Sequence, residues 1–136
     1  MSKRALITGA GSGLGLALAR RYATAGYTIA VADLDLVRAE SAVGTLGGAG
    51  AGHFAVQVDV GSDDSVAAMV AAVNARWPDG FDVLINNAGV ATAGSVADSS
   101  LEDWQWVLNI NLLGVVRGMK AFVPMFRRRG SGLVLS

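Results

Sequence analysis

A glycine-rich segment near the start of the chain has the spacing of a phosphate-binding turn. It reads Thr8-Gly-Ala-Gly-Ser-Gly-Leu-Gly15 and lies between a short apolar run, predicted to be a strand, and a helical pattern. Gly9 would allow a sharp turn, Gly13 would let backbone N–H groups approach a phosphate, and Gly15 would permit close helix packing. The partial positive charge of the helix N-terminus would face a pyrophosphate. The sequence therefore predicts a dinucleotide site, with these contacts on the turn: Gly9, Ser12, Gly13, Leu14 and Gly15.

An acidic residue follows at the end of the second predicted strand, where a dinucleotide site requires one. The carboxylate of Asp33 would accept hydrogen bonds from the adenosine ribose hydroxyls and would repel the 2′-phosphate of NADP. No Arg or Lys adjoins Asp33 in the sequence, because its neighbours are Ala32 and Leu34. The pattern favours NAD as the cofactor, with NADP as the less favoured choice. The alternative is that Asp33 only caps the next helix, a task that Asp35 could perform equally well.

Further polar residues follow the third and fourth predicted strands and interrupt a long helix. Asp59-Val60 and Asn86-Asn-Ala-Gly89 come after strands, where they could also be ordinary strand-end and turn residues. Asn111 shares a helical stripe with Trp104, Leu108 and Val115, which predicts an amide at a core position. Such a buried amide needs partners, and neighbouring backbone could supply them.

The elements that must position these residues alternate along the whole chain. Apolar runs predict strands over 4–8, 27–32, 53–58, 81–85 and 133–136, and periodic segments predict helices over about 14–25, 36–46, 62–77 and 99–128. No hairpin signal separates two strands, so we predict an α/β fold, a Rossmann-like doubly wound parallel sheet with helices on both faces. Residues 1–136 form a single domain in this reading. Because the chain stops inside a strand, we expect an incomplete sheet and the front half of a larger domain.

Composition removes several classes of function. The chain has 136 residues, of which 52% are hydrophobic, and its 11 basic residues balance 11 acidic ones. Neutrality disfavours a nucleic-acid or anionic-membrane partner. Without cysteine, and with His53 as the single histidine, thiolate and histidine-cluster metal sites are excluded. The longest uncharged run, 41–58, is rich in glycine, so we expect no transmembrane helix and a cytoplasmic protein.

The order and spacing of these motifs resemble the short-chain dehydrogenase/reductase family over residues 4–136. The spacing Thr-Gly-x-x-x-Gly-x-Gly is typical of that family. The resemblance implies that Asp59 and Val60 contact adenine, and that the Asn-Asn-Ala-Gly signature contributes these cofactor contacts: Asn86, Ala88 and Gly89. It assigns the catalytic Asn to Asn111. Hydride would pass between nicotinamide C4 and the carbon of a small-molecule carbonyl or secondary alcohol.

The chain departs from the family pattern at the acid/base. The family uses Tyr in a Y-x-x-x-K motif with a Ser about a dozen residues earlier, whereas Tyr22 and Tyr27 both lack Lys four residues later. Ser136 falls roughly three residues short of the catalytic serine position. We therefore expect the Tyr–Lys pair beyond these residues and no activity from this piece alone. The alternative is a non-catalytic NAD-binding fragment or pseudoenzyme. Related enzymes also pair the helix that carries Asn111, which predicts a homodimer or homotetramer.

Overall fold

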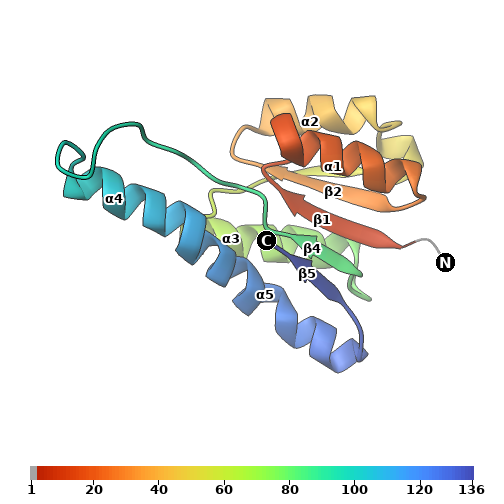
Figure 1. Ribbon diagram of the computed structural model, residues 1–136. Helices are drawn as coiled ribbons and strands as arrows, with labels where there is room; N and C mark the ends of the chain where they lie inside the picture. The colour runs from red at the N-terminus through yellow and green to blue at the C-terminus, as the bar shows by residue number, and fades with distance from the viewer. Residues whose placement is uncertain (1–2) are drawn as a thin grey trace.

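The computed structural model describes residues 3–136 and contains one five-stranded parallel sheet (Figure 1). The strands are β1 Arg4–Thr8, β2 Thr28–Asp33, β3 Phe54–Gln57, β4 Val83–Ile85 and β5 Leu133–Leu135. Their order is β3-β2-β1-β4-β5, with every neighbouring pair parallel. The chain moves outward from β1 to β3 and then returns to β4 on the other side of β1. The predicted doubly wound sheet is confirmed, and its switch point lies between β1 and β4.

Helices occupy every connection between strands that the sequence assigned to them. They are α1 Gly13–Thr24, α2 Leu36–Thr45, α3 Asp63–Arg76, α4 Leu101–Leu108 and α5 Gly114–Arg129, with a 3-10 turn η1 Ala49–Ala51. The side chains of Asp35, Ser62 and Ser100 cap α2, α3 and α4 by accepting hydrogen bonds from backbone N–H groups. Asp and Ser are favoured at this position because their side-chain oxygens satisfy N–H groups that have no partner within the helix.

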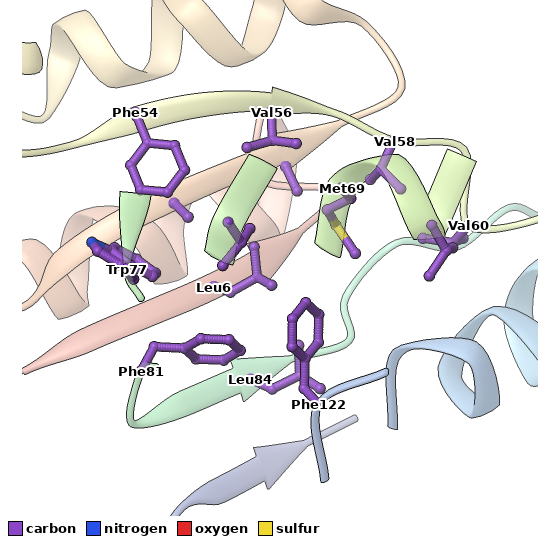
Figure 2. Close-up of a cluster of buried hydrophobic side chains, with 14 of the residues drawn as sticks. Leu6, Phe54, Val56, Val58, Val60, Met69, Trp77, Phe81, Leu84 and Phe122 are labelled. Atoms are coloured by element: carbon purple, nitrogen blue, oxygen red, sulfur yellow. The ribbon is translucent and has the colours of Figure 1, made fainter. Parts of the chain in front are cut away.

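Side chains alternate across β1 and so divide the core into two layers. Ala5 and Ile7 pack with α1 and α2 on one face, and Leu6 packs with α3 and α5 on the other. Figure 1 shows the two pairs of helices on opposite sides of the sheet. Figure 2 shows the second layer, where Phe81 meets Phe122 edge to face at 4.9 Å between ring centroids. Helices on both faces bury the central strands, as a parallel sheet requires.

The predicted single α-helix over 99–128 is corrected by an irregular turn at its middle. Between α4 and α5 lies η2 Asn109–Leu113, a π-helical segment with wider backbone hydrogen bonding. The three segments form one continuous rod (Figure 1). Its inner face is built from small and aromatic residues, and these are buried: Gly114, Gly118, Phe122 and Phe126.

Apolar surface remains exposed on this rod and on the outer strand. Leu133 and Leu135 of β5 are 47% and 40% exposed. By length and composition alone, the rod Leu101–Arg129 is the one helix within residues 3–136 that is long and apolar enough to cross a membrane. By the criterion of length and composition, the expectation that the chain contains no transmembrane helix was wrong. Part of the rod's apolarity is explained by α5, whose inner face packs on the sheet.

Candidate nucleotide-binding site

The glycine-rich turn between β1 and α1 has the backbone that its sequence predicts. Gly9 and Gly13 have φ angles of +66° and +55°, which favour glycine. A Cβ on Gly15 would lie 2.2 Å from the Gly9 carbonyl oxygen and 2.5 Å from Asn87 Nδ2, whereas a Cβ on Gly13 would meet no atom within 4 Å. Gly15 therefore allows the close helix packing that was expected, and Gly13 leaves open space in front of the α1 N-terminus.

Asp33 ends β2 with its carboxylate directed at this turn. It is 8% exposed, its Oδ2 accepts from the Gly11 N–H at 2.9 Å, and its Oδ1 accepts from the Asp35 N–H at 3.0 Å. Asp35 caps α2 by accepting from the Arg38 N–H, and this hydrogen bond lowers the pKa of Asp35. The capping alternative for Asp33 is wrong, since Asp35 fills that position.

A basic residue that the sequence neighbours of Asp33 did not reveal lies on the same cleft. Arg38, in the first turn of α2, lines the cleft together with Asp33 and Leu34. Its Nε lies 3.3 Å from Asp35 Oδ2. No Arg or Lys adjoins Asp33 in the sequence, but the fold brings Arg38 to the same cleft.

The β3–α3 loop forms a second wall. Asp59 Oδ1 accepts from the Gly61 N–H at 2.8 Å, and the Asp59 N–H donates to Ser65 Oγ at 2.8 Å. These bonds make a tight turn at the end of the strand. Val60 is buried, and both Asp59 and Val60 line the cleft.

The loop after β4 is tied to the glycine turn by the hydroxyl of Thr8. Thr8 Oγ1 accepts from the backbone N–H groups of Asn87 and Ala88, each at 3.1 Å, and Asn87 Nδ2 donates to the Gly9 carbonyl at 3.2 Å. Asn86 faces the other way, because a Cβ on Gly118 of α5 would lie 2.3 Å from Asn86 Oδ1. Asn87, which the sequence reading did not select, is thus the asparagine of this pair that lines the cleft.

Together these loops enclose a cleft of about 570 Å³ at the carboxyl ends of β1, β2, β3 and β4. The structure brings these predicted residues onto it: Gly9, Ser12, Leu14, Asp33, Asp59, Val60, Ala88 and Gly89. Four predicted residues are not on its lining: Gly13, Gly15, Asn86 and Asn111. Several further residues line the cleft and were not predicted from the sequence: Leu34, Arg38, Val58, Gly61, Asn87, Val90, Trp106, Asn109 and Ile110.

Asn111 lies in η2 and is exposed, so its expected burial in a core stripe was wrong. Its Oδ1 accepts from the Val90 N–H and its Nδ2 donates to the Val90 carbonyl, both at 2.8 Å. Neighbouring backbone thus satisfies the amide, the alternative left open by the sequence. Val90 lines both the main cleft and a second cavity of about 350 Å³ that also contacts Asn111, Ser99 and Trp104.

The titratable side chains on the main cleft are Asp33, Asp59 and Arg38 within residues 3–136. Tyr22 and Tyr27 pack edge to face at 4.9 Å on the face covered by α1 and α2, and neither lines the cleft. In the same described range no group of three or more Asp, Glu or His could hold a metal ion. The arrangement offers backbone N–H groups and carboxylates to a ligand.

Comparison with known proteins places these loops in a family. Residues 3–136 match the family model described as short chain dehydrogenase. D-threitol dehydrogenase from Mycolicibacterium smegmatis is 39% identical over 134 residues, covering 98% of this chain and 51% of that enzyme. The chain spans about half the length of the curated relatives it matches.

Solved structures agree over the same range. A short-chain dehydrogenase/reductase from Burkholderia phymatum in complex with NAD is 36% identical, with a TM-score of 0.90 over 98% of this chain and 47% of that one. An alcohol dehydrogenase from Thermococcus sibiricus complexed with 5-hydroxy-NADP is 34% identical, with a TM-score of 0.88 over 97% of this chain and 57% of that one. With the glycine turn, the buried acid after β2 and the doubly wound sheet all in place, this chain belongs to the short-chain dehydrogenase family.

Proposed function

We propose that the 570 Å³ cleft binds NAD and that the chain supplies the cofactor-binding part of an oxidoreductase acting on a small-molecule carbonyl or secondary alcohol. The observation that carries the proposal is the carboxylate of Asp33, buried at the cleft and held by the Gly11 and Asp35 N–H groups. Solved relatives hold NAD or 5-hydroxy-NADP, so the residues of this chain must decide between the two cofactors.

The residues present fit a dinucleotide. The α1 N-terminus carries no acidic side chain in its first turn, so its partial positive charge is available to a pyrophosphate. Backbone N–H groups from Gly9 to Gly15 would hold that pyrophosphate, with Ser12 and Leu14 on the rim. Asp33 would accept from the ribose hydroxyls of the adenosine.

The other two loops would hold the adenine and the inner part of the dinucleotide. We assign adenine contacts to Asp59 and Val60, and backbone contacts along the dinucleotide to Ala88 and Gly89. Asn86 is proposed as a supporting residue, because its amide is buried between α5 and β5, where it donates to Ser136 Oγ at 3.4 Å.

Chemistry would take place where the main cleft meets the second cavity. The nicotinamide ring, when bound, would give or accept a hydride. Asn111 is proposed as the catalytic Asn of the family pattern, and in this chain it holds the Val90 backbone between the two cavities. Proton transfer is assigned to a Tyr–Lys pair that these 136 residues do not contain.

A second candidate is NAD binding without turnover. It is favoured by the lack of any Tyr followed four residues later by Lys in this sequence. A turnover assay with NAD(H) and a panel of ketones and secondary alcohols, carried out on the protein as purified from its source, separates the two candidates, because a non-catalytic binder shows affinity but no change in NADH absorbance.

Cofactor preference is the direct test. In a fluorescence titration of the purified chain, NADH should bind at least tenfold more tightly than NADPH, because Asp33 repels the 2′-phosphate. Asp33→Ala should weaken NADH binding, since each lost hydrogen bond to a charged acceptor costs about 1.5–3 kcal/mol. Adding Leu34→Arg should shift the preference toward NADPH. Equal affinity of the unmodified chain for both cofactors contradicts the proposal.

The ion pair of Arg38 with Asp35 allows a second test of cofactor preference. The positive charge of Arg38 is countered by Asp35, so Asp35→Asn should release it toward the cleft while still capping α2, because Asn is as good an N-cap as Asp. NADPH affinity should rise and NADH affinity should stay within twofold.

We also propose a cytoplasmic location, no nucleic-acid or membrane partner, and a homodimer or homotetramer through the helix that carries Asn111.

A further inference from the structure

One aromatic side chain on the cleft has no place in the function proposed so far. Trp106, in the last turn of α4, lines the cleft and is 47% exposed. The proposed dinucleotide contacts come from the loops after β1, β2, β3 and β4, and α4 contributes none of them. A half-exposed indole carries a large apolar surface. Covering that surface with a ligand is favourable, because it removes apolar area from water.

The neighbours of Trp106 show which end of the cleft it occupies. Asn109 and Ile110 follow it by three and four residues on the same helical face. A Cβ on Gly61 would lie 2.6 Å from Ile110 Cδ1, and Asn109 Nδ2 donates to the Gly61 carbonyl at 3.0 Å. This face of the helix therefore packs on the Asp59–Gly61 loop. Trp106, one helical turn earlier, lines the cleft at the end formed by that loop.

Arg117 holds the helix and this loop together. Its Nη2 donates to Asn109 Oδ1 at 2.7 Å, and its Nη1 donates to the Val60 carbonyl at 2.9 Å and to the Asn109 carbonyl at 3.1 Å. Since one guanidinium group binds both elements, the turn that carries Trp106 is fixed relative to Asp59 and Val60.

A second tryptophan two residues away gives a built-in comparison. Trp104 is 42% exposed and lines the second cavity rather than the main cleft. Residues two apart on an α-helix point in widely different directions. The two side chains therefore have similar exposure and serve different cavities.

We propose that Trp106 is a nucleotide-binding residue whose indole stacks on the adenine of the dinucleotide at the Asp59–Gly61 end of the cleft. This inference rests on the proposed function. Every nucleobase offers an aromatic face, and stacking on a Trp side chain is a common source of affinity for bases. The carboxylates of Asp33 and Asp59 recognise polar groups, whereas Trp106 supplies the apolar surface that the flat base requires.

The test uses AMP, which carries adenine without nicotinamide, and NADH. The purified chain is titrated with each nucleotide by calorimetry. Trp106→Ala should weaken both by the same factor, about tenfold, which corresponds to roughly 1.4 kcal/mol of binding free energy. Trp106→Phe should restore most of the affinity, because an aromatic face remains. Trp104→Ala, the matched control, should change AMP affinity by less than twofold.

Fluorescence gives a second readout. In a Trp104→Phe background, AMP should quench the emission of the chain, and the additional change Trp106→Phe should abolish that quenching, because Trp77 is buried away from the cleft lining. If the chain binds neither nucleotide, the proposed function fails and this inference fails with it. If Trp106→Ala binds AMP and NADH as tightly as the unmodified chain, only the inference is overturned. Altered sedimentation of Trp106→Ala with unchanged AMP affinity also overturns it and assigns the indole to a subunit contact.

Discussion

Thr8 is a side chain through which the two loops on either side of the switch point are joined, together with Asn87. Its hydroxyl oxygen accepts two backbone N–H groups from the loop after β4 and lies 3.5 Å from the Ile85 carbonyl, to which it donates. The residue is 2% exposed, so water cannot replace these bonds. The hydroxyl group of Thr8 therefore helps to set the separation of Asn87 and Ala88 from the glycine turn.

Replacing Thr8 with Val keeps the shape and removes the hydroxyl. The Ala88 N–H loses its acceptor and the Asn87 N–H keeps only the Ile85 carbonyl, which should lower the free energy of unfolding by about 1–3 kcal/mol. Urea denaturation followed by circular dichroism measures this change. Thr24→Val is the control, because Thr24 is exposed and its hydroxyl donates only to Arg20 of the same helix, so its effect should stay within about 0.5 kcal/mol. Similar losses in both variants would contradict a special role for Thr8.

His53 takes the place of a backbone acceptor at the start of β3. It is buried, and its Nδ1 accepts from the Ile29 N–H at 3.0 Å, which requires an unprotonated Nδ1. Burial lowers the pKa of His53 from its usual 6.5, and a hydrogen bond to the Leu46 backbone partly opposes that shift. The folded chain therefore favours the neutral ring.

This lowered pKa predicts a loss of stability in acid. Below about pH 6.5 the unfolded chain binds a proton that the folded chain does not, so the free energy of unfolding should fall until the pH reaches the folded pKa. Above pH 6.5 the contribution of His53 is complete and constant. Urea denaturation at pH 7.5 and pH 5.5 checks this, with His53→Gln as the comparison, since Gln does not titrate and offers an oxygen to Ile29. An equal decrease in both proteins would show that carboxylates alone cause it.

At the scale of elements, the rod formed by α4, η2 and α5 positions both cavities. Arg117 joins it to the β3–α3 loop, and the exposed fraction of the Arg117 side chain is only 19%. Arg117 Nε also forms an ion pair with Asp63 Oδ1 at 2.6 Å, but the Asp63 side chain is 87% exposed, so this ion pair adds little stability. The bonds to Val60 and Asn109 are the ones that hold the loop.

Arg117→Met should lower the free energy of unfolding by about 1–3 kcal/mol, because the carbonyl and amide oxygens lose charged donors in a partly buried site. The same change at Arg128, which is exposed near the end of α5, should cost less than about 0.5 kcal/mol. Thermal and urea denaturation of both variants measure the difference. An equal loss of stability in the Arg128 and Arg117 variants would mean that the charge on the helix is responsible, and not the hydrogen bonds of Arg117 to Val60 and Asn109.

The elements explain how far the sequence could predict the site. Glycines and acids that directly follow strands could be placed, because the carboxyl ends of parallel strands meet at one edge. Asn87 could not be separated from Asn86, since adjacent residues face opposite ways and the phase of the strand end is not visible in the sequence. Arg38 reaches the cleft through the first turn of α2, which a search of the sequence neighbours of Asp33 overlooks. Asn111 was misplaced because η2 breaks the 3.6-residue period used to count the stripe.

At the scale of the whole molecule, the outer side of the rod remains apolar. Leu108, Leu112 and Leu113 are 47%, 55% and 46% exposed, and Val116 and Met119 are half-buried beside them. A contiguous surface of this kind commonly marks a protein interface. Burial releases about 25 cal/mol per Å² of apolar surface, which favours association before the entropy of assembly is counted.

We expect a dimer or tetramer in sedimentation equilibrium at micromolar concentration. Val116→Glu should shift the chain toward monomer, because association would bury an unpaired carboxylate. Val37→Glu is the control, since Val37 is 75% exposed on α2, away from the rod, and should leave the assembly unchanged. A strict monomer for the unmodified chain at these concentrations contradicts the interface.

The π-helical segment also has a consequence for the cleft. Such a segment is equivalent to one residue inserted into an α-helix, and each residue of an α-helix turns the chain by about 100°. The insertion rotates α4 relative to α5, so Gly114 and Gly118 can pack on Val60 and Asn86 while Trp106 faces the cleft. Deleting one residue within 109–113 would give a more regular helix with the same inner face and would turn Trp106 away from the cleft. The length of this one segment therefore decides which aromatic group lies on the cleft while the inner face of α5 stays the same.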